Sequence, residues 1–183
     1  AGIKAPTGKT DVQDEGEYLE ADLQPGSGSW DYYAGVVLSK EFNDFSLHSN
    51  VLYKYTTSGD FESELGNVFS YNLAFAYKLI EDDDAHGFTK ETHEEHEEHN
   101  ENFDFSLAIF LEFNGEYVLQ DQQYGIDIQN TGGNVIFMTT GLQLVTNNSY
   151  SAFFAIGIPI YEDNNGIQNE RNYKATIGIG KSF

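Results

Sequence analysis

Hydrophobic and polar residues alternate with period two along most of the chain. The longest run extends from Phe103 to Leu119, where apolar side chains recur at nearly every second position and Asp, Ser, Glu and Asn stand between them. Such alternation is typical of a β-strand whose two faces meet different surroundings. The pattern predicts about eight strands and no helix, over the ranges 1–6, 30–42, 45–55, 69–79, 103–119, 133–146, 149–161 and 173–183.

The connections between these strands differ in length. Asn43-Asp44 and Asn147-Asn148 suit two-residue hairpin turns. If consecutive strands pair antiparallel, the connections fall alternately at two ends of the sheet. One end, the turn end, holds these two turns and one long exception, the segment 81–102. The other, the loop end, holds only long connections: 7–29, 58–65, 120–132 and 162–171.

Strand length and side-chain chemistry favour a membrane barrel. The longer runs have 12 to 17 residues, whereas a membrane strand needs about 9–11 and a typical strand of a soluble protein has about 5–6. The apolar face is rich in Phe and Tyr, and its only charges are Lys40 and Lys181, which lie near the turn end. Short turns at one end and long loops at the other are usual in bacterial outer-membrane barrels. A soluble, secreted β-sandwich binding module is an alternative, because it too alternates.

We therefore predict an all-β fold, an antiparallel up-and-down transmembrane β-barrel forming one domain over residues 1–183. Its setting would be the outer membrane of a Gram-negative bacterium, with outer-membrane lipid as a partner. The polar face would line a channel or port for small molecules. The candidate lumen-lining residues are Asp31, His48, Lys54, Lys78, Asp104, Glu112 and Glu116.

The strand count limits that passage. Side chains fill the interior of an eight-stranded barrel. A passage for small molecules therefore requires either upstream strands that widen the barrel or an oligomer, so the chain is predicted to supply part of a larger barrel. The last strand closes on an aromatic residue, Phe183, which resembles the signal that the barrel-assembly machinery recognises. Lys181 departs from the aromatic residue common two positions before that end.

Two further segments carry a family resemblance. Gly2-Ile3-Lys4-Ala5-Pro6-Thr7-Gly8 resembles a glycine-aliphatic-lysine-x-proline-threonine-glycine strand end, and the run from Leu23 to Asp31 resembles a second signature. Gly66-Asn67 and the closing strand from Tyr173 also fit. Together they resemble the Gram-negative outer-membrane family that is named for the MetA pathway of phenol degradation and labelled as transporters. The resemblance implies a membrane barrel that handles apolar or aromatic compounds.

Composition removes several other classes of function. Among 183 residues, 30 are acidic and 9 basic, so the formal net charge of −21 disfavours a nucleic-acid-binding surface. The absence of Cys excludes disulfides and thiol catalysis. The predicted strands hold five acidic residues and six lysines, while the connections hold 25 acidic and three basic residues. The negative charge therefore belongs to the loops and does not oppose a membrane location.

The connection 81–102 is a candidate metal-binding insertion. It interleaves carboxylates, Glu95 among them, with His86, His93, His96 and His99. Imidazoles mixed with carboxylates suit zinc, nickel or copper(II), so we expect a divalent ion to bind within 86–99. A solvated acidic linker is the alternative. The barrel itself would require no cofactor.

No pattern indicates catalysis. Glu112 and Glu116 share a face of one strand, but four residues along a strand separate them by about 13 Å. That distance is too long for glycoside hydrolysis. His48 has Ser46 and Asn50 on its face, without a nucleophile motif around it. We predict that the protein is not an enzyme.

Overall fold

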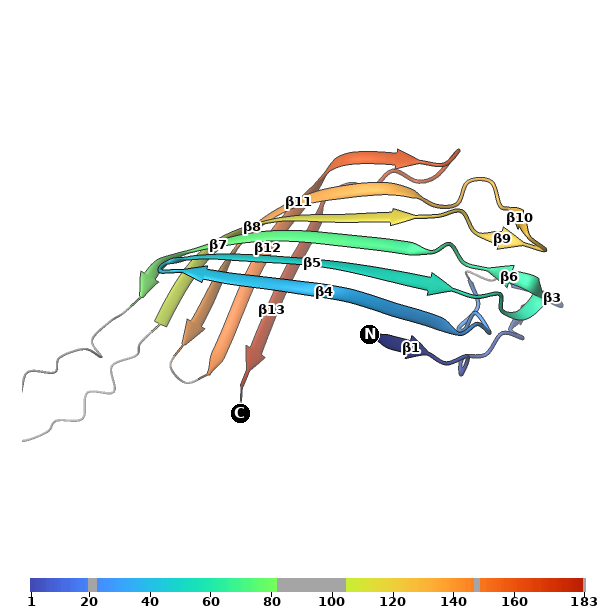
Figure 1. The fold of residues 1–183 in the computed structure, drawn as a ribbon, viewed down its shortest axis with the longest axis horizontal. Coiled ribbons are helices and arrows are strands. Elements are labelled where there is room, and N and C mark those ends of the chain that lie inside the picture. Colours follow the sequence, from blue (N-terminus) through green and yellow to red (C-terminus); the bar gives the residue numbers. More distant parts are fainter. Residues whose placement is uncertain (20–22, 82–104, 147–148, 183) are drawn as a thin grey trace, which may run out of the picture.

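An eight-stranded antiparallel sheet dominates the structure (Figure 1). The computed structural model describes residues 1–19, 23–81, 105–146 and 149–182. The spatial order of the strands follows their order in the chain, as an up-and-down topology requires. In that order they are β1 (Gly2–Lys4), β4 (Asp31–Phe42), β5 (Phe45–Thr56), β7 (Val68–Glu81), β8 (Phe105–Val118), β11 (Gly133–Thr146), β12 (Tyr150–Asn164) and β13 (Lys174–Lys181).

The all-β prediction is confirmed, and each predicted strand corresponds to one strand of the sheet. The two-residue turn at Asn43-Asp44 is confirmed as well: Phe42 pairs with Phe45, and Asn43 has φ 49°. The turn predicted at 147–148 lies outside the described residues. The alternation therefore located each strand to within a few residues. Successive side chains point to opposite faces along the whole length of a strand, so the pattern lasts as long as the strand does.

The loop end contains short elements that alternation does not predict. A hairpin of β2 (Gln13–Asp14) and β3 (Glu17–Tyr18) precedes β4. A small sheet joins β6 (Ser63–Glu64), β9 (Gln122–Gln123) and β10 (Ile126–Asp127). One 3-10 turn, η2, spans Asp60–Glu62. Strands of two residues are too short to show a period, so only their pairing in the structure reveals them.

The two faces of the large sheet differ in chemistry, and the apolar face is exposed. Val36, Leu38 and Ile158 are 58%, 68% and 47% exposed. Among the described residues, only two apolar side chains are buried, Val135 and Ala155, and both lie on the polar face. The only other sheets within the described ranges are the short ones at the loop end. The described part of the chain therefore has no protein layer packed against the apolar face.

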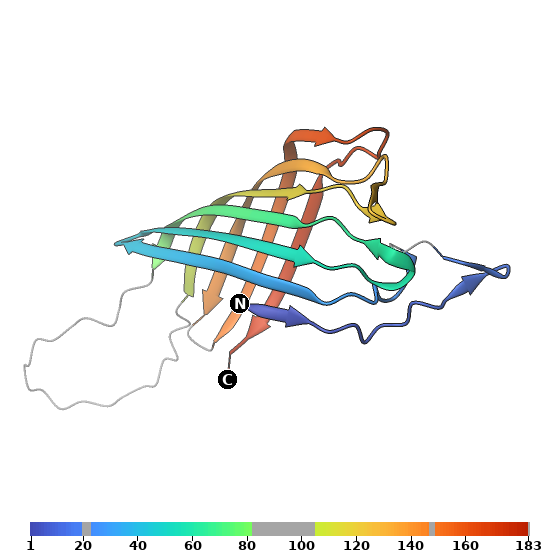
Figure 2. The same cartoon turned by 45° about the vertical axis from the view of Figure 1, so that its right-hand side comes forward.

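The sheet curls, so that β13 comes to lie behind the first strands (Figure 2). Polar-face residues from β4 to β11, among them Glu41, Lys78 and Gln143, line one common pocket, which places the polar face on the inside of the curl. We call the polar face concave and the apolar face convex. The described residues leave the sheet open, because β1 and β13 form its two edges and do not pair with each other. Over the described residues the observed unit is thus a curled open sheet and not a closed barrel.

Aromatic side chains cover glycines on neighbouring strands. On the convex face, a Cβ atom on Gly115 would lie 2.1 Å from ring carbons of Tyr71. On the concave face, a Cβ on Gly141 would lie 2.5 Å from Cζ of Phe110, and Gly178 is covered by a phenyl ring in the same way. Glycine under an aromatic ring allows a sheet to bend while the ring shields its backbone.

Candidate functional site

A belt of hydrogen-bonded amides crosses the middle of the concave face. Asn50 on β5, Asn72 on β7 and Asn114 on β8 lie opposite one another. Asn72 Nδ2 donates to Asn50 Oδ1 at 2.9 Å, and Asn114 Nδ2 donates to Asn72 Oδ1 at 3.0 Å. Thr139 on β11 extends the belt, because its Oγ1 donates to Asn114 Oδ1 at 3.2 Å. The belt presents neutral donors and acceptors across four strands.

Ionisable side chains lie on both sides of this amide belt. Lys54 and Glu116 stand on the loop-end side, and His48 and Glu112 stand on the turn-end side. The His48 ring is hydrogen-bonded through Nδ1 to Ser39 Oγ at 3.0 Å. A histidine on the polar face with a hydroxyl partner is a satisfied polar group. Within the described residues nothing further orients this pair for catalysis.

Lys174 is a concave-face residue absent from the predicted lumen set. It crosses above Gly157, where a Cβ would lie 2.7 Å from the lysine Cε, and its Nζ stands 4.5 Å from the centre of the Phe137 ring. A cation over a phenyl face is attracted by the ring quadrupole. In the alternation of the last strand, Tyr173 falls on the apolar face and Lys174 on the polar face. The sequence alone could therefore have placed Lys174 in the predicted lumen set.

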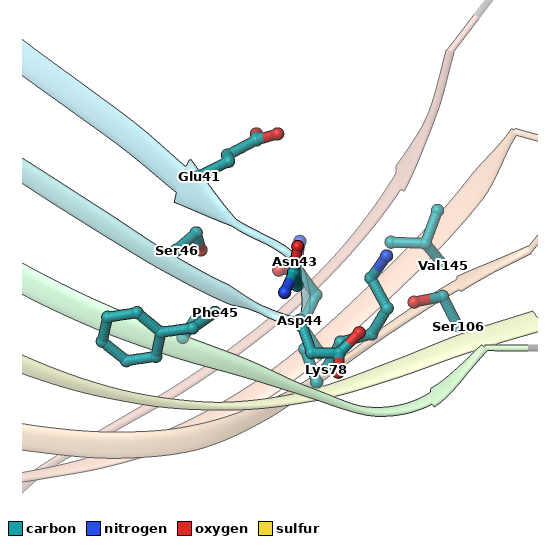
Figure 3. A pocket seen from close by; sticks show the side chains of 11 residues that line it. Glu41, Asn43, Asp44, Phe45, Ser46, Lys78, Ser106 and Val145 are labelled. Atoms are coloured by element: carbon teal, nitrogen blue, oxygen red, sulfur yellow. The ribbon is translucent and has the colours of Figure 1, made fainter.

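A pocket of about 230 Å³ opens on the concave face at the turn end (Figure 3). In Figure 3, Lys78 extends from β7 toward Ser106 and Val145, while the Phe45 ring points away from the group. The lining residues are Glu41, Asn43, Asp44, Phe45, Ser46, Ala76, Lys78, Ser106, Ala108, Gln143 and Val145. The pocket therefore combines charged and hydroxyl groups with small apolar side chains, drawn from β4 through β11.

Asp31, one of the predicted lumen-lining residues, forms the centre of a buried polar cluster at the loop end of the polar face. Its side chain is 3% exposed, and its Oδ2 lies 2.7 Å from Lys4 Nζ. Ser29 Oγ donates to Asp31 Oδ1 at 2.8 Å, and Lys4 Nζ also donates to Ser27 Oγ at 2.7 Å. We call these four residues the Lys4–Asp31 cluster. It joins the two segments that carry the family resemblance.

The same two segments approach each other through glycines. A Cβ on Gly8 would lie 2.7 Å from Gly26 Cα, and a Cβ on Gly26 would lie 2.6 Å from Gly8 Cα. No side chain fits between backbones at that separation. These motif residues therefore serve a structural purpose, which is to hold the chain before β4 against the chain after β1.

The Gly66-Asn67 motif is structural in the same sense. Asn67 Oδ1 accepts hydrogen bonds from the backbone N of Thr56 at 2.7 Å and from its Oγ1 at 3.0 Å. The Gly66 N–H donates to Asp121 Oδ1 at 2.7 Å. Leu119 N donates to the carbonyl of Asn67 at 2.9 Å. The motif thus ties the loop-end termini of β5, β7 and β8 together.

We expect Gly66→Ala to destabilise the fold by about 1–3 kcal/mol, as an overpacked buried site does. The added Cβ would stand 1.9 Å from the carbonyl oxygen of Leu119. Gly2→Ala is the matched control, because its Cβ would meet nothing within 4 Å. Urea unfolding followed by the fluorescence of Trp30 measures both variants. Equal midpoints for the two would contradict this account of Gly66.

A second ion pair, also absent from the predicted set, anchors the last loop-end connection. Arg171 Nη1 lies 3.2 Å from Glu162 Oε1, and its backbone N donates to the same carboxylate. Asn164 Nδ2 donates to Glu162 Oε1 at 2.9 Å. This hydrogen bond, followed by those from Arg171, lowers the pKa of Glu162 below its ordinary value. Glu162 lies opposite Val135, two residues before the loop-end terminus of β12 at Asn164.

Several predicted site residues lie outside the described residues: Asp104 of the lumen set, and the candidate metal ligands His86, His93, Glu95, His96 and His99. The lumen position of Asp104 and metal binding by the other five residues stay predictions. Within the ranges that the structure describes, no group of three or more His, Asp or Glu side chains could hold a metal ion. No helix in the described part of the chain is long and apolar enough to cross a membrane.

Comparisons with family models, curated proteins and solved structures found no match to this chain. The family resemblance of the loop-end motifs therefore stays a prediction, and the functional argument rests on the sheet itself.

Proposed function

We propose that this protein is an outer-membrane β-barrel protein whose concave face lines a passage or docking port for small molecules. The observation that carries the proposal is the exposed apolar convex face on a long antiparallel sheet. Exposed apolar surface of this extent calls for a partner, and for a sheet of 12- to 15-residue strands lipid is a suitable one. A soluble sandwich would need a second sheet over that face, and the described residues supply none.

Aromatic residues at both ends of the convex face support a membrane setting. At the loop end the rings of Tyr32 and Tyr55 stack at 6.5 Å, and at the turn end those of Phe42 and Phe45 lie 6.4 Å apart. Outer-membrane barrels carry aromatic girdles at both interfaces. Lys40 lies over the Phe42 ring at 5.5 Å, which suits a lysine reaching for the interface.

The concave face supports the passage of molecules that have both polar and aromatic parts. Its amide belt offers uncharged hydrogen-bonding groups, and Phe137 and Phe110 place rings on the same face. A polar interior is the usual lining of membrane barrels that conduct solutes. The resemblance of the loop-end motifs agrees with an apolar or aromatic cargo, and we propose no catalytic role for the chain.

Membrane fractionation tests this proposal. The full protein should be recovered in the outer-membrane fraction, and the unheated sample should migrate differently on a gel from the boiled one. If the convex face did not meet lipid, a chain this rich in acidic residues should be soluble without detergent. Solubility therefore discriminates between a membrane protein and a soluble one. Full solubility without detergent, with identical migration before and after boiling, would overturn the membrane assignment.

A further inference from the structure

The turn-end pocket on the concave face is lined by charges of both signs. Glu41 and Asp44 supply carboxylates, and Lys78 is the one cationic residue among the described residues that line it. Hydroxyl groups accompany them at Ser46 and Ser106. Ligand sites in proteins are hollows in which a few polar groups converge, and they are few per protein. The turn-end pocket is therefore a candidate ligand site.

Backbone contacts fix the two walls of the pocket to each other. One wall is the turn between β4 and β5, and the other is formed by β7, β8 and β11. The backbone N–H of Lys78 donates to the carbonyl oxygen of Asp44 at 2.7 Å, which joins the turn to β7. The turn itself is tight, since Phe42 pairs with Phe45. The pocket is therefore formed before any ligand arrives, as most small-molecule sites are.

Small side chains keep the middle of the pocket open. Glu41 on β4 lies opposite Ser46 on β5, which in turn lies opposite Ala76 on β7. Lys78 follows two positions along β7, so the Cα atoms of Glu41 and Lys78 are about 12 Å apart. Ala108 lies opposite Lys78 on β8, and its methyl group occupies little of the space beside the lysine. A small molecule can therefore stand between the two charged side chains.

Glu41 and Lys78 do not neutralise each other. Within the described ranges no ion pair or hydrogen bond engages the Glu41 carboxylate, which is exposed to solvent. Lys78 is partly buried, and in Figure 3 its nitrogen extends toward Ser106 and away from Glu41. An ammonium group has three N–H donors, so it can bind the carboxylate of a ligand in addition to a partner within the protein. The pocket thus offers separate groups for an anion and for a cation.

We propose that this pocket binds a small zwitterion, with its carboxylate on Lys78 and its ammonium group on Glu41. A simple anion would also meet the carboxylates of Glu41 and Asp44, and a simple cation would also meet the ammonium group of Lys78. A zwitterion has a favourable partner for each of its charges. The inference rests on the proposed function for its setting, because it names one class of cargo, compounds charged like an amino acid, and a binding site for them at the turn end of the passage.

Isothermal titration calorimetry on the full protein, in a non-ionic detergent where one is needed, tests the proposal. The probes are glycine, β-alanine, γ-aminobutyrate and ε-aminocaproate, which separate the two charges by increasing distances. At least one of them should bind. Butyrate and butylamine carry one charge each and should bind about tenfold more weakly, because each lacks one charge-assisted contact. If no zwitterion binds at millimolar concentration, or if butyrate or butylamine binds as tightly as the best zwitterion, the proposal is wrong.

Charge variants assign the binding to these side chains. Glu41→Gln and Lys78→Gln should each weaken binding of the best zwitterion by about tenfold. The double variant Glu41→Lys, Lys78→Glu should restore binding, because a zwitterion can bind in the reversed direction. Lys9→Gln is the matched control, since Lys9 lies in a connection at the opposite end of the sheet. Affinities of the two single variants equal to that of the control would overturn the proposal.

The outcome is separable from that of the proposed function, because binding is measured on the purified protein whether or not detergent is needed. Zwitterion binding by a fully soluble protein would support the pocket and refute the membrane assignment. An outer-membrane protein that binds no zwitterion would refute the pocket and leave the membrane assignment in place.

Discussion

Leu73→Arg should lower the free energy of unfolding by about 2–4 kcal/mol if the convex face meets lipid as we propose, because that is the cost of a cationic side chain near the bilayer midplane. Leu73 points outward from the middle of β7 and is 36% exposed on the convex face. Its neighbours in the chain, Asn72 and Ala74, point to the concave face. Arginine at position 73 would have no counter-charge in the lipid and no water.

Ala74→Arg is the matched control, on the same strand and at the same depth. Ala74 lies between His48 on β5 and Glu112 on β8, so an arginine there would face a carboxylate on the polar side of the sheet. We expect a much smaller loss of stability than at Leu73. Urea titration in lipid vesicles, read by the gel shift between unheated and boiled samples, measures both.

The contrast separates the two environments that the convex face could have. If the convex face met water, Leu73→Arg would be a surface substitution within about 0.5 kcal/mol of neutral. A neutral result at Leu73, or a larger loss at Ala74, would therefore contradict the assignment of the convex face to lipid.

Lys4→Met should destabilise the loop end by about 2–4 kcal/mol, more than Asp31→Asn does. Removing one partner of a buried ion pair leaves the other charge uncompensated. Asp31 is the buried partner, with a side chain 3% exposed, whereas the Lys4 side chain is 38% exposed and can turn toward water. The lost ion pair therefore costs more when the lysine is removed than when the carboxylate is.

Asp31→Asn is expected to cost about 1 kcal/mol, because the amide keeps an oxygen for the hydrogen bond from Ser29. The double variant Lys4→Met, Asp31→Asn should recover part of the loss seen in Lys4→Met alone. Equilibrium unfolding of the four proteins forms a double-mutant cycle. Equal losses in the two single variants, with additive behaviour in the double, would show that the ion pair carries no net coupling.

The alternation of residue types was enough to predict the strands of the large sheet. Asn72 and Leu73 illustrate why: adjacent side chains in a strand point to opposite faces, so their chemistry reports the surroundings of each face directly. The turn at Asn43-Asp44 could also be predicted from its own residues, since few residue types readily adopt the positive φ that Asn43 has. The general charge pattern followed from the same sorting, with acidic residues in the loops.

The candidate site was only partly predictable. Period two assigned His48, Lys54 and Glu112 to the polar face, but it could not pair them across strands. The ion pair of Asp31 with Lys4 was not predicted, because the two residues are 27 positions apart and only pairing of β1 with β4 brings them together. The predicted lumen set also lacked Lys174, although the alternation of the last strand places this residue on the polar face.

By itself, the sequence determined which residues share a face, where the strands lie and at which end each connection falls. These are local properties, because a strand reverses its side-chain direction at every residue whatever it pairs with. Only the tertiary structure decided the register that aligns Asn50, Asn72 and Asn114, the approach of Gly8 to Gly26, and the open edges at β1 and β13. Those features depend on contacts between residues far apart in the chain, which no local pattern encodes.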